Sequence, residues 1–215
     1  MNKLIIFDLD GTLIDSLPDI YDCVNLTLAH FNYPLRQKSE IRQFIGNGAR
    51  NLIKQSFGDI NGKELDEKLA YYNHIYTNGG SPKTCLFDGV DQLLYALKEQ
   101  GYKLAILTNK PQMTTDKVYE KYLSQFNFDM VVGQSGSVKC KPDPTATLYI
   151  LQKLNVEKEN AIFIGDGETD YLTSKNAGVK NVSVLWGYRD KDQLEKVGAS
   201  NFANQIKDIF TLINF

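Results

Sequence analysis

Residues 4–12 read LIIFDLDGT, a short apolar run that ends in two aspartates separated by one residue. Continuous apolar residues are typical of a strand buried on both faces of a parallel sheet. An Asp-x-Asp-Gly-Thr pattern arises by chance about two times in a thousand in a chain of this length. An acidic turn would explain one aspartate and the glycine, but not two carboxylates spaced by one. The stretch therefore predicts a parallel sheet with chemistry at the end of its first strand.

Beyond this strand, apolar runs alternate with segments of helical periodicity. The expected strands are 103–107, 128–132, 161–164 and 181–185, and the expected helices are 90–100, 111–122, 144–154 and 168–177. Such alternation is typical of a doubly wound, Rossmann-like α/β sheet. We predict that fold class for a catalytic core formed by residues 1–15 and 82–215.

Residues 16–81 interrupt the alternation with helical spacing and no clear strand. The exit at 78–82, NGGSP, is rich in the residues that form turns and flexible connections. We predict an α-helical cap over 16–81, inserted after the first strand and able to move over the sheet.

The composition argues against large charged partners. The chain has 215 residues, a net charge of -2 and a pI near 5.7, which gives no basic field for nucleic acid or anionic lipid. No apolar stretch has the length of a transmembrane helix or the form of a signal peptide. We expect a cytoplasmic protein with a small-molecule partner.

The spacing of Asp8 and Asp10 suits phosphoryl chemistry. Residues two apart at a strand end direct both carboxylates into the crevice above the sheet, so one can attack while the other handles a proton. A carboxylate attacks phosphorus poorly until a divalent cation offsets the repulsion between them. Magnesium suits a site made of oxygen ligands. The pattern predicts a magnesium-dependent hydrolase of a small phosphorylated metabolite.

Three other expected strands end in polar groups. Thr108 and Asn109 lie where a hydroxyl and backbone amides at a helix start can hold phosphate oxygens, although a threonine there also serves as a helix cap. Lys141, beside prolines that fix the backbone, is our preferred cation for the phosphate, with Lys139 as the alternative. We therefore expect a phosphate-binding subsite between these strand ends.

The segment 165–170, GDGETD, follows the fourth of these strands. Asp166 is the better candidate for a metal ligand because it comes directly after the strand. Asp170 is a supporting candidate, although acids also favour the first turn of a helix. Since ligands bind at the carboxyl ends of parallel strands, the four strand ends are expected to form one site.

These four motifs, in this order, resemble those of the haloacid dehalogenase-like superfamily of hydrolases. The resemblance implies a helical cap after the first strand and an aspartyl-phosphate intermediate. It also implies a role for each matching residue: Asp8 as nucleophile and magnesium ligand, Asp10 as general acid and base with its carbonyl on the metal, Thr108 and Lys141 as phosphate ligands, and Asp166 completing the metal site with Asp170 behind it.

Within the superfamily the chain is most similar to phosphoglycolate phosphatases, through the segments 15–19, 45–48 and 108–111. It departs from their usual pattern at Asp88 and at 167–169. The resemblance makes 2-phosphoglycolate a candidate substrate. Arg50, which follows 45–48, is then a candidate for the substrate carboxylate, with a solvated surface arginine as the equal alternative.

Other functions remain as alternatives. A dehalogenase needs neither magnesium nor a second aspartate, so Asp10 and Asp166 argue against it. A phosphosugar mutase shares the carboxylates, but its relatives usually place a histidine soon after the first motif, and residues 15–22 contain none. A non-catalytic protein that senses a phosphorylated metabolite has no need of a nucleophile, an acid and a metal site together.

Overall fold

The computed structural model describes residues 3–58, 60–79, 82–136 and 138–213. Its main element is a sheet in which the described residues form six strands, in the order β5-β4-β1-β6-β7-β8, with every neighbouring pair parallel. The strands are β1 (Leu4–Phe7), β4 (Lys103–Pro111), β5 (Met130–Gln134), β6 (Ala161–Gly165), β7 (Lys180–Val184) and β8 (Phe202–Ala203). The predicted α/β fold with a parallel sheet is confirmed.

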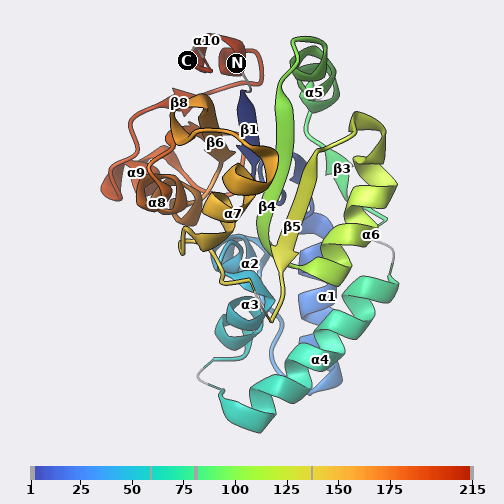
Figure 1. Ribbon diagram of the computed structural model, residues 1–215. Coiled ribbons are helices and arrows are strands. Elements are labelled where there is room, and N and C mark those ends of the chain that lie inside the picture. The colour runs from blue at the N-terminus through green and yellow to red at the C-terminus, as the bar shows by residue number, and fades with distance from the viewer. Residues whose placement is uncertain (1–2, 59, 80–81, 137, 214–215) are drawn as a thin grey trace.

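Helices cover both faces of this sheet (Figure 1). Ile5 and Phe7 of β1 belong to a cluster with α5 (Val90–Glu99) and α6 (Gln112–Tyr122). The alternate residues Leu4 and Ile6 pack in a second cluster with α7 (Thr145–Leu154) and α8 (Glu168–Ala177). Burial on both faces is why the first strand is apolar without alternation. The remaining core helices are η1 (Ser124–Phe126), η2 (Lys158–Asn160), α9 (Lys191–Lys196) and α10 (Asp208–Leu212).

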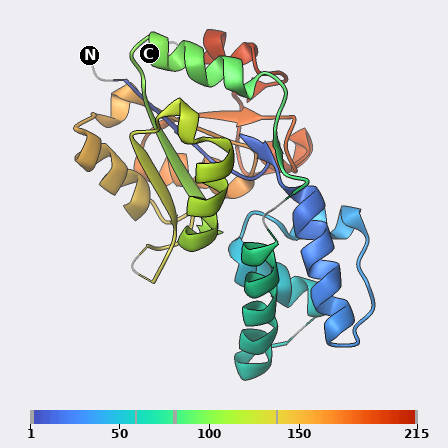
Figure 2. The ribbon, with the colours of Figure 1, turned by 90° about the vertical axis from the view of Figure 1, so that its right-hand side faces the viewer.

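A helical cap follows the first strand. Its helices are α1 (Leu17–His30), α2 (Lys38–Phe44), α3 (Gly48–Phe57) and α4 (Gly62–Asn78). They enclose an apolar cluster of their own, in which Val24, Leu28, Ile41 and Ile53 are fully buried. The cap lies beyond the carboxyl ends of β4 and β5 and forms a separate lobe in the side view (Figures 1 and 2).

A short ribbon connects the cap to the core. The two-residue strands β2 (Ile14–Asp15) and β3 (Cys85–Leu86) pair antiparallel, one on the way into the cap and one on the way out. Strands this short leave no periodic signal, so the sequence did not predict them. Of the predicted hinge at 78–82, residues 80 and 81 lie outside the described part of the chain.

The sequence misjudged some element boundaries, and one of these matters for the site. The strand expected at 103–107 continues to Pro111, which pairs with Gln134 after a register shift, and α6 begins only at Gln112. Residues 108–111 are therefore extended rather than the first turn of a helix. The strand expected at 128–132 runs from Met130 to Gln134. No helix in the described ranges has the length and apolarity needed to cross a membrane.

Candidate active site

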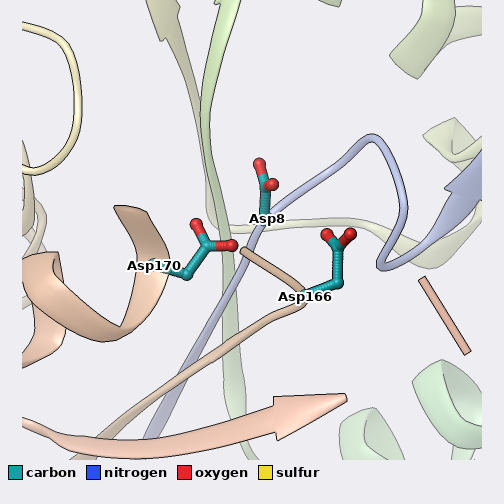
Figure 3. Close-up of side chains that lie close together, drawn as sticks. All are labelled: Asp8, Asp166 and Asp170. Atoms are coloured by element: carbon teal, nitrogen blue, oxygen red, sulfur yellow. The ribbon is translucent and has the colours of Figure 1, made fainter. Parts of the chain in front are cut away.

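Three carboxylates meet at the carboxyl end of the sheet, with their side chains close together (Figure 3). Asp8 follows β1, Asp166 follows β6, and Asp170 lies in the first turn of α8. Among the described residues these side chains form an acidic cluster, in which one oxygen of each lies within 4.8 Å of the others. All three are buried, with at most 8% of any residue exposed. Oxygen donors gathered this closely are suited to a hard divalent cation.

One lysine faces this acidic cluster. The Lys141 ammonium lies 2.8 Å from Oδ1 of Asp8 and 2.5 Å from Oδ1 of Asp170, and the residue is 4% exposed. Lys139, the alternative from the sequence, instead pairs at 3.3 Å with Asp143, and its side chain is 73% exposed. Of the two lysines, the structure brings only Lys141 to the carboxylates.

The protonation of the cluster reflects its burial. Burial, reinforced by the Asp170 carboxylate, raises the pKa of Asp8 to about 8, although Lys141 acts in the opposite direction. Burial and Asp170 also raise the pKa of Asp166 to about 6, against hydrogen bonds from Tyr188 and Thr12. Burial alone lowers the pKa of Lys141, but Asp170 and Asp8 outweigh it, so the net shift is upward and the ammonium stays charged. The cluster thus carries more negative charge than its one lysine can neutralise.

Neighbouring groups fix the orientation of the carboxylates. Oδ1 of Asp166 accepts a hydrogen bond from the Thr12 hydroxyl at 3.0 Å, and Oδ2 accepts one from the Tyr188 amide at 2.7 Å. Oδ2 of Asp170 accepts the Gly167 amide at 2.9 Å. Gly11 has a φ of 88° and lies against the Asp166 carboxylate, where a side chain would collide. The glycine and threonine of the first motif therefore support Asp166.

Asp10 lies apart from the acidic cluster. Its Oδ1 accepts hydrogen bonds from the Ser16 hydroxyl at 2.5 Å and from the Lys110 ammonium at 2.9 Å, and its Oδ2 lies 3.2 Å from the same ammonium. The Asp10 side chain thus does not belong with the metal-ligand candidates. The resemblance gives a metal role to the backbone carbonyl of Asp10, and that role stays a prediction. Lys110 is a site residue that the sequence analysis missed.

The two candidates on β4 differ in their surroundings. Thr108 is buried and lines the cavity above Asp8, as expected for a phosphate ligand. The Asn109 side chain donates to the carbonyls of Gly46 at 2.9 Å and of Lys141 at 3.2 Å, and accepts the Lys141 amide at 2.7 Å. The Asn109 side chain thus links the cap to the Lys141 loop, and the binding of phosphate oxygens by backbone amides of this segment stays a prediction.

A cavity opens between the core and the cap. Its core side carries Asp8, Asp10, Thr108 and Lys110, and its cap side is largely apolar, with residues such as Ile20, Ile45, Leu52, Tyr72 and Tyr76. This composition suits a small ligand held by a few polar groups.

Arg50 does not line this cavity. It pairs at 2.6 Å with Asp66, and its side chain is 55% exposed. The structure thus places Arg50 at the surface, as in the alternative of a solvated arginine, and its contact with a substrate stays a prediction.

The sequence analysis also missed the loop after β7. The Tyr188 hydroxyl accepts hydrogen bonds from the amides of Ser16 and Leu17, where the chain enters the cap. The Arg189 guanidinium binds Glu168 of the core at 2.8 Å and donates to cap carbonyls of Arg42, Gln43 and Ile45, which lie at the end of α2. Side chains of a loop that bind backbone amides and carbonyls elsewhere in the chain have no sequence signature.

Comparison with known proteins gives consistent results. A family model described as haloacid dehalogenase-like hydrolase matches residues 5–184. The chain is 31% identical over 213 residues to phosphoglycolate phosphatase 1 of Pseudomonas aeruginosa, covering 96% of this chain and 78% of that protein. It is 34% identical over 197 residues to the phosphoglycolate phosphatase of Psychrobacter arcticus, covering 86% and 84% respectively. The crystal structure of a predicted phosphoglycolate phosphatase from Haemophilus somnus superimposes with a TM-score of 0.90 at 27% identity, over 99% of this chain and 98% of that one.

Proposed function

The chain belongs to the haloacid dehalogenase-like hydrolase family, and we propose that it is a magnesium-dependent phosphatase that forms an aspartyl phosphate on Asp8. The observation that carries this proposal is the acidic cluster of Asp8, Asp166 and Asp170, which holds three buried carboxylates against one ammonium. A phosphatase of this kind needs a nucleophile and a cation beside it. This cluster can supply the nucleophile and the oxygen ligands of the cation.

The residues present fit a magnesium ion. Asp8 and Asp166 offer hard oxygen ligands, and burial together with the Asp170 carboxylate raises the pKa of each, a cost to their charged forms that a bound cation would offset. Thr12 and the Tyr188 amide already orient Asp166, as groups behind a metal ligand do. A bound magnesium ion would supply positive charge that lowers the repulsion between Asp8 and the phosphoryl oxygens.

The roles of the protein side chains follow. An oxygen of Asp8 forms a bond to phosphorus while the bond from phosphorus to the ester oxygen breaks, and Asp10 gives its proton to the departing oxygen. Asp10 then takes a proton from water, whose oxygen attacks phosphorus and frees Asp8. Lys141 and Thr108 would bind the phosphoryl oxygens, and the cap would exclude bulk water.

The relatives' names indicate a first substrate to test. Two similar proteins are phosphoglycolate phosphatases, so 2-phosphoglycolate is our candidate for this chain. The cavity supports a small phosphorylated metabolite rather than a polymer, because residues of the cap cover it opposite Asp8.

Phosphate release from a panel of small phosphomonoesters, including 2-phosphoglycolate, tests the proposal. We expect release by the wild type to require magnesium and to fall by about 10³-fold or more in Asp8→Asn. If substrate is converted without accumulation of free phosphate, a phosphosugar mutase becomes the better reading. If no ester reacts in either protein, the hydrolase proposal fails.

A further inference from the structure

Lys110 is a buried ammonium for which the proposed chemistry gives no role. It lies near the carboxyl end of β4, is 8% exposed, and is the only lysine or arginine side chain that lines the cavity in the described ranges. Its Nζ lies 2.9 Å from Oδ1 and 3.2 Å from Oδ2 of Asp10. A lysine is seldom buried unless its charge is paired, and here its partner is the expected general acid.

The same ammonium contacts the cap. Its Nζ donates to the hydroxyl of Tyr76 at 2.9 Å and lies 4.6 Å from the centre of the Tyr76 ring. Tyr76 belongs to α4, close to the point where the chain leaves the cap, and is itself buried. Lys110 therefore joins a carboxylate of the core to a phenol of the cap.

These contacts make the two oxygens of Asp10 unequal. Oδ1 accepts the Ser16 hydroxyl at 2.5 Å and the closer contact with Lys110, whereas Oδ2 has only the longer contact with Lys110. Oδ1 is therefore the more firmly held of the two oxygens, and contacts of the ammonium with both oxygens fix how the carboxylate lies. If the cap opened, Tyr76 would move away from Lys110 and the ammonium would lose one of its two partners.

We propose that Lys110 is a positioning residue that fixes the orientation of Asp10, and that Tyr76 makes this orientation depend on cap closure. The inference rests on the proposed function, because it takes Asp10 to be the general acid. The competing role for Lys110 is direct binding of a carboxylate on the substrate.

Three esters separate these roles. The leaving groups of 2-phosphoglycolate and of 2-hydroxyethyl phosphate both need a proton to depart. Only the leaving group of 2-phosphoglycolate carries a carboxylate. The p-nitrophenolate leaving group of p-nitrophenyl phosphate departs without a proton. The kcat and KM of each ester would be measured with magnesium for the wild type, Lys110→Met and Tyr76→Phe. Lys153→Met, at an exposed lysine of α7, is the matched control.

In Lys110→Met we expect kcat/KM for both alkyl esters to fall about 10²-fold, as for a misplaced catalytic group. The kcat/KM of p-nitrophenyl phosphate should fall by less than about tenfold, because it reports the steps up to departure of the first leaving group and p-nitrophenolate needs no acid. The kcat values are not used for this comparison, because they include hydrolysis of the aspartyl phosphate, which depends on Asp10 for every ester. Tyr76→Phe keeps the ring and removes only the hydroxyl. It should show the same preference for the aryl ester, with a loss of about tenfold for the alkyl esters.

An equal loss of kcat/KM for all three esters would show that Lys110 is merely structural and would overturn the inference. A raised KM confined to 2-phosphoglycolate would overturn it in favour of carboxylate binding. If Lys110→Met does not fold, Tyr76→Phe decides: an unchanged ratio of alkyl to aryl rates contradicts the inference. If the wild type hydrolyses none of the esters, the proposed function fails and the positioning role fails with it, whereas the outcomes above leave the function intact.

Discussion

At the scale of single residues, burial determines the chemistry of this site. Asp8, Asp166 and Asp170 lie within one another's reach, and the one ammonium beside them contacts Asp8 and Asp170. Because these side chains are buried, each carboxylate depends on its protein partners to stabilise its charge. Removing a partner, or changing the protonation of a carboxylate, should therefore change how the site binds a cation.

The Thr12 hydroxyl supports Asp166 directly, at 3.0 Å. Thr12→Val keeps the shape of the side chain and removes this hydrogen bond. We expect magnesium affinity to fall by about 10- to 100-fold, the usual cost of removing a group that orients a metal ligand. Isothermal titration calorimetry measures this directly. Thr27→Val in α1 removes a hydroxyl bonded to the Cys23 carbonyl of the cap, and its affinity should match the wild type.

The pH dependence of magnesium binding follows from the raised pKa values of Asp166, about 6, and Asp8, about 8. Both protons must leave before a cation binds, so affinity should rise with pH between about 6 and 8 and level off above. The unfolded chain releases these protons near pH 3.8, whereas the folded, metal-free protein keeps them longer. Its free energy of unfolding should therefore fall as pH rises from about 3.8 to about 8, with the Asp166 contribution lost by about pH 6, and should level off above about pH 8. Calorimetric titrations and thermal melts across this range check both trends, and an affinity independent of pH would contradict them.

At the scale of elements, the sequence predicts best where one rule dominates. The apolar run before Asp8 identifies β1, and the rule that ligands lie at strand ends brings Asp166 and Lys141 to the same edge of the sheet. Lys110 was missed because the segment 108–111 resembles a helix start, whereas it is extended and holds Lys110 toward Asp10. The place of Arg50 was left open because helical periodicity does not say which face of α3 meets the cavity.

The loop after β7 gives a prediction at this scale. Gly187 lies against the Asp166 side chain and the Gly11 carbonyl, where a Cβ atom has no space. We expect Gly187→Ala to destabilise the protein by about 1–3 kcal/mol through overpacking and to weaken magnesium binding by displacing Asp166. Denaturant unfolding measures the first effect. Gly136→Ala, where a Cβ would meet no atom within 4 Å, is the control that should change neither quantity.

At the scale of the whole molecule, the cap and core are joined across the site as well as through the β2-β3 ribbon. Arg189 spans this junction, with Glu168 on the core side and the end of α2 on the cap side. The contact with Arg189 gives Glu168, in the first turn of α8, a role in joining the two parts of the molecule.

Arg189→Met should shift the cap toward an open arrangement. A hydrogen bond made by a charged group contributes about 1.5–3 kcal/mol. Loss of even one such contact predicts a fall in kcat/KM of about tenfold or more. Small-angle X-ray scattering should show a larger radius of gyration for the variant. Lys191→Met, at an exposed lysine two residues away, is the control. An unchanged radius of gyration and an unchanged kcat/KM in Arg189→Met would contradict this role of Arg189 in joining the cap to the core.

The central claim is that the phosphoryl group is transferred to Asp8. Asp10→Asn should still react with p-nitrophenyl phosphate, whose leaving group needs no acid, but it should be slow to activate water, so the covalent intermediate should accumulate. Rapid quenching with magnesium present, borohydride reduction and peptide mass spectrometry would locate it. The account predicts an acyl phosphate, reduced to homoserine, at position 8 alone. A burst of p-nitrophenolate with the phosphoryl group on another residue, or on none, would contradict it.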